Sequence, residues 1–218
     1  MKNQSTTVLA TDDKGIEINP NTLKTWVTNK SKIELANFFY HRFYGRYIKP
    51  FDFKNKEYIN EYKNGFAIMT SCCLLIETYT SFAELAFLNT NHKSEKTFGY
   101  FFLKNIEFQS FSKNGLQLNE YLSENRIKNK GIPSDFYKNV RCGILHNGET
   151  RNGWKIVRNG PLFDENSKRI NSVLFLEKLK NILINFKTKL IASDFDNSEI
   201  WKTYRSRIEI LIEETENN

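Results

Sequence analysis

The stretch that decides the fold runs from Tyr58 to Asn89 and reads YINEYKNGFAIMTSCCLLIETYTSFAELAFLN. Its apolar residues recur at spacings of three and four, which is the period of an α-helix. They are Phe66, Met69, Cys73, Ile76, Tyr79, Ala83 and Ala86. The centre of the stretch is apolar on nearly every side, and a helix of that kind is buried among other helices. The stretch therefore predicts a helical bundle with this segment at its centre.

Helical patterns also precede and follow this central stretch. They cover Ser31 to Ile48, Ser94 to Ile106, Leu116 to Ile127, Pro133 to Asn147, Val173 to Ala192 and Asn197 to Glu213. We therefore expect an all-α fold in which residues 21–218 form a single helical domain. The length of the chain fits one domain.

Two segments depart from the helical pattern. Residues 1–20 are mostly polar and predict a flexible N-terminal arm, with one short strand from Gly15 to Asn19. Gly153 to Phe163 alternates around Asn159-Gly160, a dipeptide typical of hairpin turns. We expect a small two-stranded β-hairpin there, with Trp154 packing it on the bundle.

The composition describes a moderately basic chain. Its 218 residues include 32 Lys and Arg against 25 Asp and Glu, which gives a formal net charge of +7. A basic excess is compatible with a polyanionic partner such as RNA. Lysines that only solvate helix faces would give the same charge, so the composition leaves both interpretations open.

The cysteines indicate a reducing compartment. Cys72, Cys73 and Cys142 are odd in number and lack the spacing of a metal site. No signal peptide is apparent, and we expect no apolar run long enough for a membrane span, so the predicted location is the cytoplasm, with no membrane partner. No glycine-rich phosphate loop or paired-histidine motif occurs, and we therefore expect no cofactor and no metal.

Arg141 and His146 are the strongest candidates for phosphate binding and proton transfer. An arginine fork matches phosphate geometry, and a histidine can exchange a proton near neutral pH. On one helix a five-residue step turns about 140° beyond a full circle, so the two side chains point to different sides. A second copy packed across a two-fold axis would bring two arginines and two histidines to one groove. The alternative is a solvated arginine and a helix-terminal histidine that only stabilises the helix end.

Several neighbours could support this pair. Asn147 ends the helix, and Glu149 either orients His146 or faces solvent. Arg151 follows as a candidate RNA contact. Glu77 lies in the apolar central helix, where a buried carboxylate needs a partner, and this favours a core salt bridge over catalysis.

A second candidate RNA-binding strip lies on the helix that begins near Ser31. His41, Arg42 and Arg46 share this helix and could contact phosphates. The rings of Tyr40, Phe43 and Tyr44 nearby could stack on bases, although their helical spacing also fits a core position.

The segment Arg141-Cys142-Gly143-Ile144-Leu145-His146 resembles the arginine–four residues–histidine motif of the HEPN superfamily. The following Asn147-Gly148-Glu149-Thr150-Arg151-Asn152-Gly153-Trp154 resembles a prokaryotic HEPN subfamily in which the histidine precedes a Glu-Thr and a Gly-Trp. Leu75-Ile76-Glu77 in the central helix is also similar to that family. The resemblance covers residues 60–192.

This resemblance implies a HEPN-like helical bundle that forms a homodimer around the motif. It implies a metal-independent endoribonuclease of a toxin–antitoxin or phage-defence system, with an antitoxin protein as a further partner. By similarity, Arg141 would contact the scissile phosphate, and His146 would act as general acid or base while the RNA 2′-hydroxyl attacks. Active members often carry Asn, Asp or His where this chain has Cys142. The alternative is therefore a non-catalytic HEPN module that binds RNA, a nucleotide or a protein partner.

Overall fold

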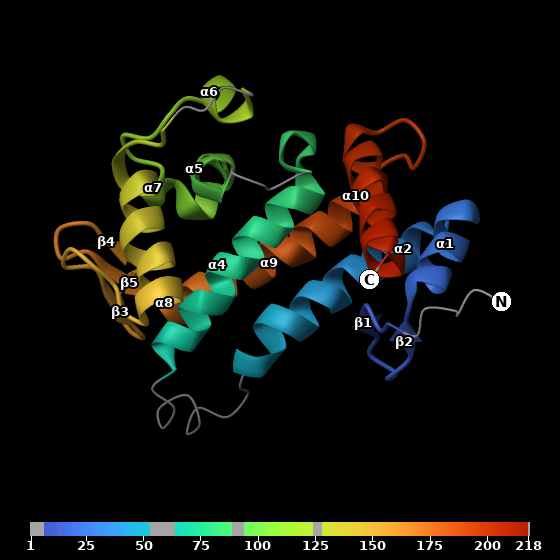
Figure 1. Ribbon diagram of the computed structural model, residues 1–218, viewed down its shortest axis with the longest axis horizontal. Coiled ribbons are helices and arrows are strands. Elements are labelled where there is room, and N and C mark those ends of the chain that lie inside the picture. The colour runs from blue at the N-terminus through green and yellow to red at the C-terminus, as the bar shows by residue number, and fades with distance from the viewer. Residues whose placement is uncertain (1–6, 53–63, 89–93, 124–127, 218) are drawn as a thin grey trace.

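The computed structural model describes residues 7–52, 64–88, 94–123 and 128–217, and Figure 1 shows their arrangement. The expected mostly helical fold is confirmed. The α-helices are α1 (Pro20–Thr28), α2 (Lys32–Phe43), α4 (Gly65–Ala83), α5 (Ser94–Lys104), α6 (Leu118–Leu122), α7 (Gly131–Phe136), α8 (Cys142–Asn147), α9 (Ser172–Ala192) and α10 (Glu199–Glu216). The π-helical segments are η1 (Tyr44–Ile48) and η5 (Tyr137–Arg141), and short 3₁₀ segments are η2 (Lys49–Phe51), η3 (Leu85–Phe87) and η4 (Ile106–Phe111).

The central helix predicted from the sequence is α4. It packs against α9, α5 and α10, and Figure 1 shows it crossing α9 in the middle of the molecule. Its buried residues include Ile68, Cys72, Leu75 and Ile76, and their removal from water supplies much of the driving force for packing. The prediction is confirmed for Gly65–Ala83, while residues 58–63 and Asn89 lie outside the described part of the chain.

The length and composition of α4 alone would allow it to span a membrane. This corrects the expectation that no apolar run was long enough. However, 56% of its most apolar window is buried inside the fold. Burial of that kind is what the core helix of a soluble protein shows, so α4 is only weak evidence for a membrane span.

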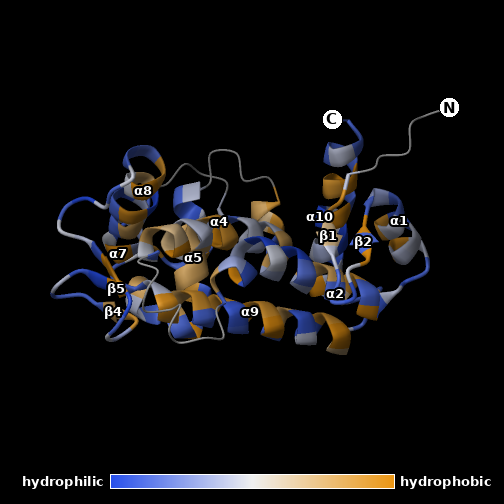
Figure 2. Cartoon of the chain, turned by 90° about the horizontal axis from the view of Figure 1, so that it is seen from below, coloured by the Kyte–Doolittle hydropathy of each residue, from blue (hydrophilic) through white to orange (hydrophobic). Residues whose placement is uncertain are grey.

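The elements divide between two ends of the molecule, as Figures 1 and 2 show. At one end, α1 and α10 pack together beside α2, and an antiparallel pair of strands, β1 (Ala10–Thr11) and β2 (Glu17–Ile18), contacts α2. The strand expected between Gly15 and Asn19 is confirmed as β2. Leu9 and Ile18, from the segment assigned to the N-terminal arm, are buried in the core.

The other end carries the motif helix and a small sheet. α7, η5 and α8 form one continuous helix from Gly131 to Asn147. It ends at Gly148, whose φ of 71° lies in the left-handed region that glycine adopts without strain. The period of the sequence did not predict the π turns of η5, which widen the helix just before α8.

The strand pairing predicted after the motif helix is wrong. The sheet has three strands in the order β3 (Lys155–Val157), β5 (Arg169–Asn171), β4 (Phe163–Asp164). β5 runs parallel to β3 and antiparallel to β4, so the two segments flanking Asn159-Gly160 do not pair with each other.

Two side chains explain this correction. Asp164 Oδ1 accepts hydrogen bonds from the backbone N–H groups of Asn166 and Ser167, which places the hairpin turn between β4 and β5. Asn171 Nδ2 donates to the carbonyl oxygen of Gly160 at 2.8 Å, which holds the Asn159-Gly160 bend beside the end of β5. The buried ring of Trp154 stacks on Phe163, with centroids 5.4 Å apart, and lies edge-on to Phe136, so Trp154 does pack the sheet on the bundle.

Candidate functional site

Arg141 forms a bidentate ion pair with Glu77 where α8 meets α4. Arg141 Nε donates to Glu77 Oε1 at 3.1 Å, and Nη2 donates to Oε2 at 3.2 Å. The two side chains are only 16% and 17% exposed. Paired parallel bonds of this kind fix the plane of the guanidinium as well as its position. The pair uses Nε and Nη2, so the Nη1 group stands outside it.

Tyr137 and Cys142 surround the guanidinium of Arg141 beside Glu77. Its Cζ atom lies 5.5 Å from the centroid of the Tyr137 ring, within cation–π range. Burial alone would lower the pKa of Arg141, but the hydrogen bonds and charge of Glu77, together with smaller contributions from Tyr137 and Cys142, raise it. Burial, with a smaller contribution from the neighbouring Cys142 thiol, raises the pKa of Tyr137 to about 12. The cluster therefore holds a permanent positive charge beside a neutral phenol.

His146 lies in the last turn of α8 with its side chain exposed. In the described part of the chain, no side-chain hydrogen bond or ion pair joins the His146 imidazole to another residue. It does not meet Arg141 within one chain, because the five-residue step turns it away from the α4 face that Arg141 occupies. The imidazole is thus free to meet a ligand or a second protein chain.

The loop after His146 is anchored to the π segment. Arg151 Nη2 donates to Asn147 Oδ1, and the Arg151 backbone N–H donates to the Asn139 carbonyl oxygen at 2.9 Å. Asn152 Nδ2 donates to Asn139 Oδ1 at 2.8 Å. No pattern in the sequence pointed to Asn139, because its partners lie on the returning loop. Its contacts hold Arg151 at the same end of the helix as His146.

A glycine lets this loop return against α8. A Cβ atom built on Gly143 would lie 2.5 Å from the Glu149 carbonyl oxygen, which is closer than real Cβ atoms come. The side chain of Glu149 is exposed and makes no bond to His146 among the residues described. The structure therefore gives Glu149 a role through its backbone and does not place its carboxylate on the histidine.

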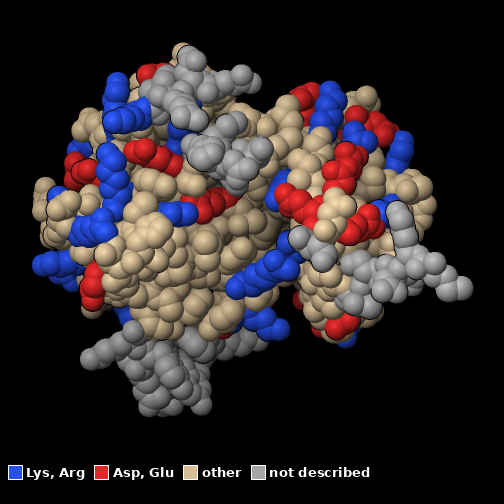
Figure 3. Space-filling view, viewed as in Figure 1, with Lys and Arg blue, Asp and Glu red and all other residues tan. Residues whose placement is uncertain are grey.

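An uncharged surface adjoins this site. Figure 3 shows a broad expanse without Lys, Arg, Asp or Glu across the face where Figure 1 places α4. On α4 itself, Phe66 and Leu74 are exposed by 37% and 38%. They are eight residues apart and so share one side of the helix, and Glu77 is less than one turn beyond Leu74. The apolar surface thus leads directly to the Arg141–Glu77 pair.

The second predicted strip, His41, Arg42 and Arg46, lies at the other end of the molecule against the β1–β2 hairpin. The suggestion that Phe43 stacks on bases is wrong, because Phe43 is fully buried. Tyr40 and Tyr44 are half-buried and stack on each other, with centroids 5.3 Å apart. The structure does not bring this strip to Arg141 or His146.

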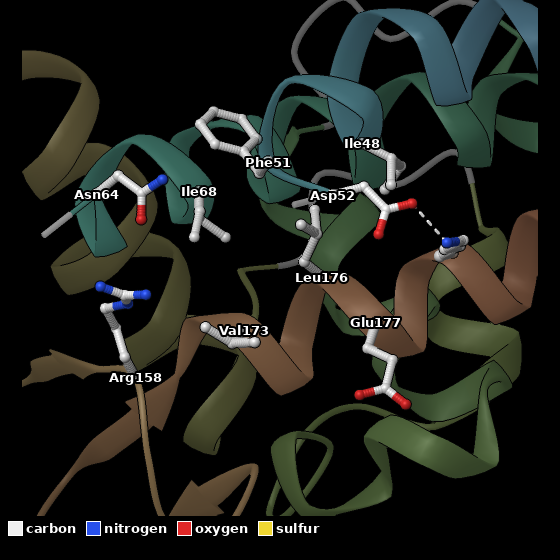
Figure 4. A pocket seen from close by; sticks show the side chains of 10 residues that line it. Ile48, Phe51, Asp52, Asn64, Ile68, Arg158, Val173, Leu176 and Glu177 are labelled. Carbon is white, nitrogen blue, oxygen red and sulfur yellow. Dashed lines mark hydrogen bonds and ion pairs between the residues drawn. The ribbon is translucent and has the colours of Figure 1, made fainter. Parts of the chain in front are cut away.

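A separate cavity of about 230 Å³ lies between η1, α4 and α9. Figure 4 shows Ile68 and Leu176 among its apolar walls, the ion pair of Asp52 with Lys180 at one side, and Asn64 with Arg158 at the other. No lining residue in the described chain is a histidine or cysteine. Sequence reasoning missed this cavity because its walls come from four separate segments.

Neither a metal-ligand cluster among the described residues nor a similar known protein identifies the function of these sites. Within the described ranges, no three His, Cys, Asp or Glu side chains gather so that they could hold a metal ion. The chain matches no protein-family model, and neither characterised proteins nor solved structures give a significant match. The proposed function therefore depends on the geometry of the chain's own residues.

Proposed function

We propose that the protein is a metal-independent endoribonuclease that cleaves single-stranded RNA, with a HEPN-like site formed by Arg141 and His146 of two copies. The observation that carries the proposal is the bidentate pair with Glu77. It holds the guanidinium in a fixed orientation and leaves Nη1 outside the pair, where it can donate to a phosphate oxygen. Fixing a charged donor before substrate binds is how an enzyme lowers the cost of orientation.

The apolar face of α4 supports a homodimer. Phe66 and Leu74 are exposed on α4, the helix that also carries Glu77. A two-fold axis through this face would place both copies of the motif helix around one groove. The exposed His146 of one copy would then reach the phosphate held by Arg141 of the other. The dimer supplies the juxtaposition that a single chain lacks.

The cleavage step needs only the two histidines and the arginines. His146 of one copy, in its neutral form, accepts the proton of the RNA 2′-hydroxyl as that oxygen attacks phosphorus. The bond from phosphorus to the 5′-oxygen breaks, and the partner subunit's His146, in its protonated form, donates a proton to that oxygen. Arg141 stabilises the charge that develops on the phosphate. The products are a 2′,3′-cyclic phosphate and a 5′-hydroxyl.

The resemblance of the motif extends this proposal to a biological setting. We place the enzyme in the cytoplasm, as a component of a toxin–antitoxin or phage-defence system that an antitoxin protein holds inactive. Arg151, anchored beside the end of the motif helix, would contact the RNA next to the cleaved bond.

Cys142 favours a second function, a non-catalytic module that binds RNA. The thiol lies beside Tyr137 and Arg141. A thiol is a weak hydrogen-bond partner and orients a substrate poorly. If this departure from the family pattern abolishes chemistry, the same surface would hold RNA without cutting it.

The test is cleavage of single-stranded RNA in EDTA by wild type, Arg141→Ala and His146→Ala. Lys189→Ala is the matched control, because Lys189, like His146, is an exposed basic residue in the last turn of a helix. We expect wild type and the control to cleave, and the two motif variants to lose activity by about 100-fold or more. Cleavage that requires added metal would contradict the mechanism, and RNA binding without cleavage would favour the second function.

The dimer is tested separately by sedimentation. Leu74→Asp places a charge on the proposed interface, and we expect it to give a monomer without ribonuclease activity. Ile184→Asp is the control, since Ile184 on α9 is exposed to a similar extent, 40% against 38%. A Leu74→Asp variant that stays dimeric would rule out this face as the interface.

A further inference from the structure

A basic groove lies between the β1–β2 hairpin and the end of α2 with η1. Its volume is about 510 Å³. The helical wall is formed by His41, Arg42, Gly45, Arg46 and Lys49, whose spacing keeps them on one side of the helix. A Cβ atom on Gly45 would meet nothing within 4 Å, so the middle of this wall is open. Lys49 was not among the residues that the sequence singled out.

Two arginines converge in this groove without a carboxylate partner. Arg42 Nη1 and Arg46 Nη2 both donate to the carbonyl oxygen of Leu9, at 2.7 Å and 3.2 Å. Among the residues that the structure describes, neither arginine forms an ion pair, and the buried Nε of Arg42 has no hydrogen-bond partner. Burial and the nearby charge of Arg46 lower the pKa of Arg42 to about 10. Two like charges are thus held together with only a neutral acceptor between them.

The hairpin side of the groove contains two carboxylates, and both have other roles. Asp12 Oδ1 accepts from the backbone N–H groups of Lys14 and Ile16, at 2.9 Å and 2.8 Å, and so holds the hairpin turn. Asp13 Oδ1 lies 3.4 Å from His41 Nδ1, but its side chain is 90% exposed. The His41 side chain is only 10% exposed, but a pair whose carboxylate lies almost fully in solvent contributes little, so Asp13 can move aside for a stronger anion.

We propose that this groove is a phosphate-binding site, in which Arg46, Lys49 and His41 donate to the phosphate oxygens and Arg42 supplies charge from the floor. Phosphate geometry suits guanidinium donors, and an anion here would relieve the repulsion between the arginines. The site does not rest on the proposed ribonuclease, because the hairpin and the motif helix lie at opposite ends of the molecule (Figure 1).

The surroundings of the groove fit a phosphate that belongs to a nucleic acid or a nucleotide. The ring of Tyr40 lies 5.9 Å from that of His41 and stacks on Tyr44. Lys187 Nζ lies 5.3 Å from the centre of the Tyr40 ring, and Lys180 Nζ lies 5.5 Å from that of Tyr44. Lys187 therefore extends the basic surface beyond the groove, past rings of the type on which bases stack, while Lys180 is paired with Asp52.

The experiment measures binding by the full-length His146→Ala protein, so that RNA is not consumed. The probes are a fluorescein-labelled single-stranded RNA, inorganic pyrophosphate and AMP. We expect the double variant Arg46→Gln/Lys49→Gln to weaken binding by about tenfold or more at low salt. Asp13→Asn should strengthen it by about twofold, because it removes a competing carboxylate. Arg46 and Lys49 are both exposed, so the double variant should still fold.

The control is Lys104→Gln/Lys189→Gln, which removes the same charge from exposed positions on α5 and α9. Binding of all three probes would identify a site for phosphate in general, as in a free nucleotide, and binding of RNA alone would identify the polynucleotide backbone. Either result supports the site if the groove variant weakens binding and the control does not. Equal weakening by the two double variants, or no binding of any probe, would overturn the proposal. If the protein does not cleave RNA in EDTA, the proposed ribonuclease fails, but the result of this binding experiment still decides the phosphate site.

Discussion

The two ends of the molecule hold their arginines in different ways. At the motif end, Arg141 is paired with the carboxylate of Glu77, which fixes its orientation and balances its charge. At the hairpin end, Arg42 and Arg46 share the neutral carbonyl oxygen of Leu9. A carboxylate partner suits an arginine that must be positioned for chemistry, whereas a neutral partner leaves charge available to attract an anion.

The two ends also share a feature of the backbone. Arg141 is the last residue of the π segment η5, and Arg46 lies within the π segment η1. π turns are rare and occur often at functional sites, because they change the direction in which the following side chains point. At both ends, an arginine of the candidate site therefore lies in a segment where the backbone departs from the regular α-helix.

The largest predicted effect concerns the ion pair at the motif end. Glu77→Gln leaves the mostly buried charge of Arg141 without its partner, and we expect it to lower the free energy of unfolding by about 3 kcal/mol. Arg46→Gln at the exposed hairpin end should change it by less than about 0.5 kcal/mol. Urea unfolding followed by circular dichroism measures both.

A double variant checks the physical reason for that difference. Glu77→Met with Arg141→Met removes both charges, and we expect it to recover most of the stability that Glu77→Gln loses. If Glu77→Gln lowered the free energy of unfolding as little as Arg46→Gln, Glu77 would not be stabilising Arg141. The proposed difference between the arginines at the two ends would then be contradicted.

The second prediction compares one glycine from each end. Gly143→Ala brings a methyl group against the Glu149 carbonyl oxygen and should destabilise the protein by about 1–2 kcal/mol. Gly45→Ala meets open space and should stabilise it by about 0.5 kcal/mol, because alanine loses less backbone entropy in a helix. Thermal unfolding of the two variants should give shifts of opposite sign, and shifts of the same sign would show that the loop after His146 is not tightly packed.

The smallest predicted effect is a pH dependence at the motif end. The pKa of Tyr137 in the folded protein is raised to about 12, above its ordinary value near 10. Its contribution to stability is therefore complete below pH 10 and is lost as the pH rises toward 12, because the unfolded chain ionises first. The stability advantage of wild type over Tyr137→Phe should shrink between pH 10 and 12 in urea unfolding. A constant difference would mean that the phenol is not desolvated beside Arg141.

Sequence periodicity predicted the long helices, because α4 and α9 bury residues at regular helical spacing, but it missed α1 (Pro20–Thr28). It also indicated that Glu77 needs a partner. It could not identify Arg141 as that partner, since the pair joins residues 64 positions apart through tertiary packing. The order of the small sheet was missed because Asn171 and Asp164 decide it, through bonds to backbone groups that no local pattern reveals.

The groove at the hairpin end was predicted only in part. Helical spacing placed His41, Arg42 and Arg46 together. It could not show that the hairpin returns its Leu9 carbonyl oxygen to the two arginines, because that contact spans more than 30 residues. The π segments were also beyond the sequence, because the apolar period of a helix barely changes over a single widened turn.

The most direct test of the composite site is RNA cleavage in EDTA by dimers in which one subunit lacks both motif residues. Wild type is mixed for this purpose with an excess of the double variant Arg141→Ala/His146→Ala. In a mixed dimer only the wild-type subunit then carries Arg141 and His146, so the second His146, which donates the proton to the 5′-oxygen, is missing. If the site lies between two copies, the excess variant should lower the activity of each wild-type chain by about tenfold or more. Undiminished activity, with mixed dimers demonstrably formed, would contradict a shared site around Arg141 and His146.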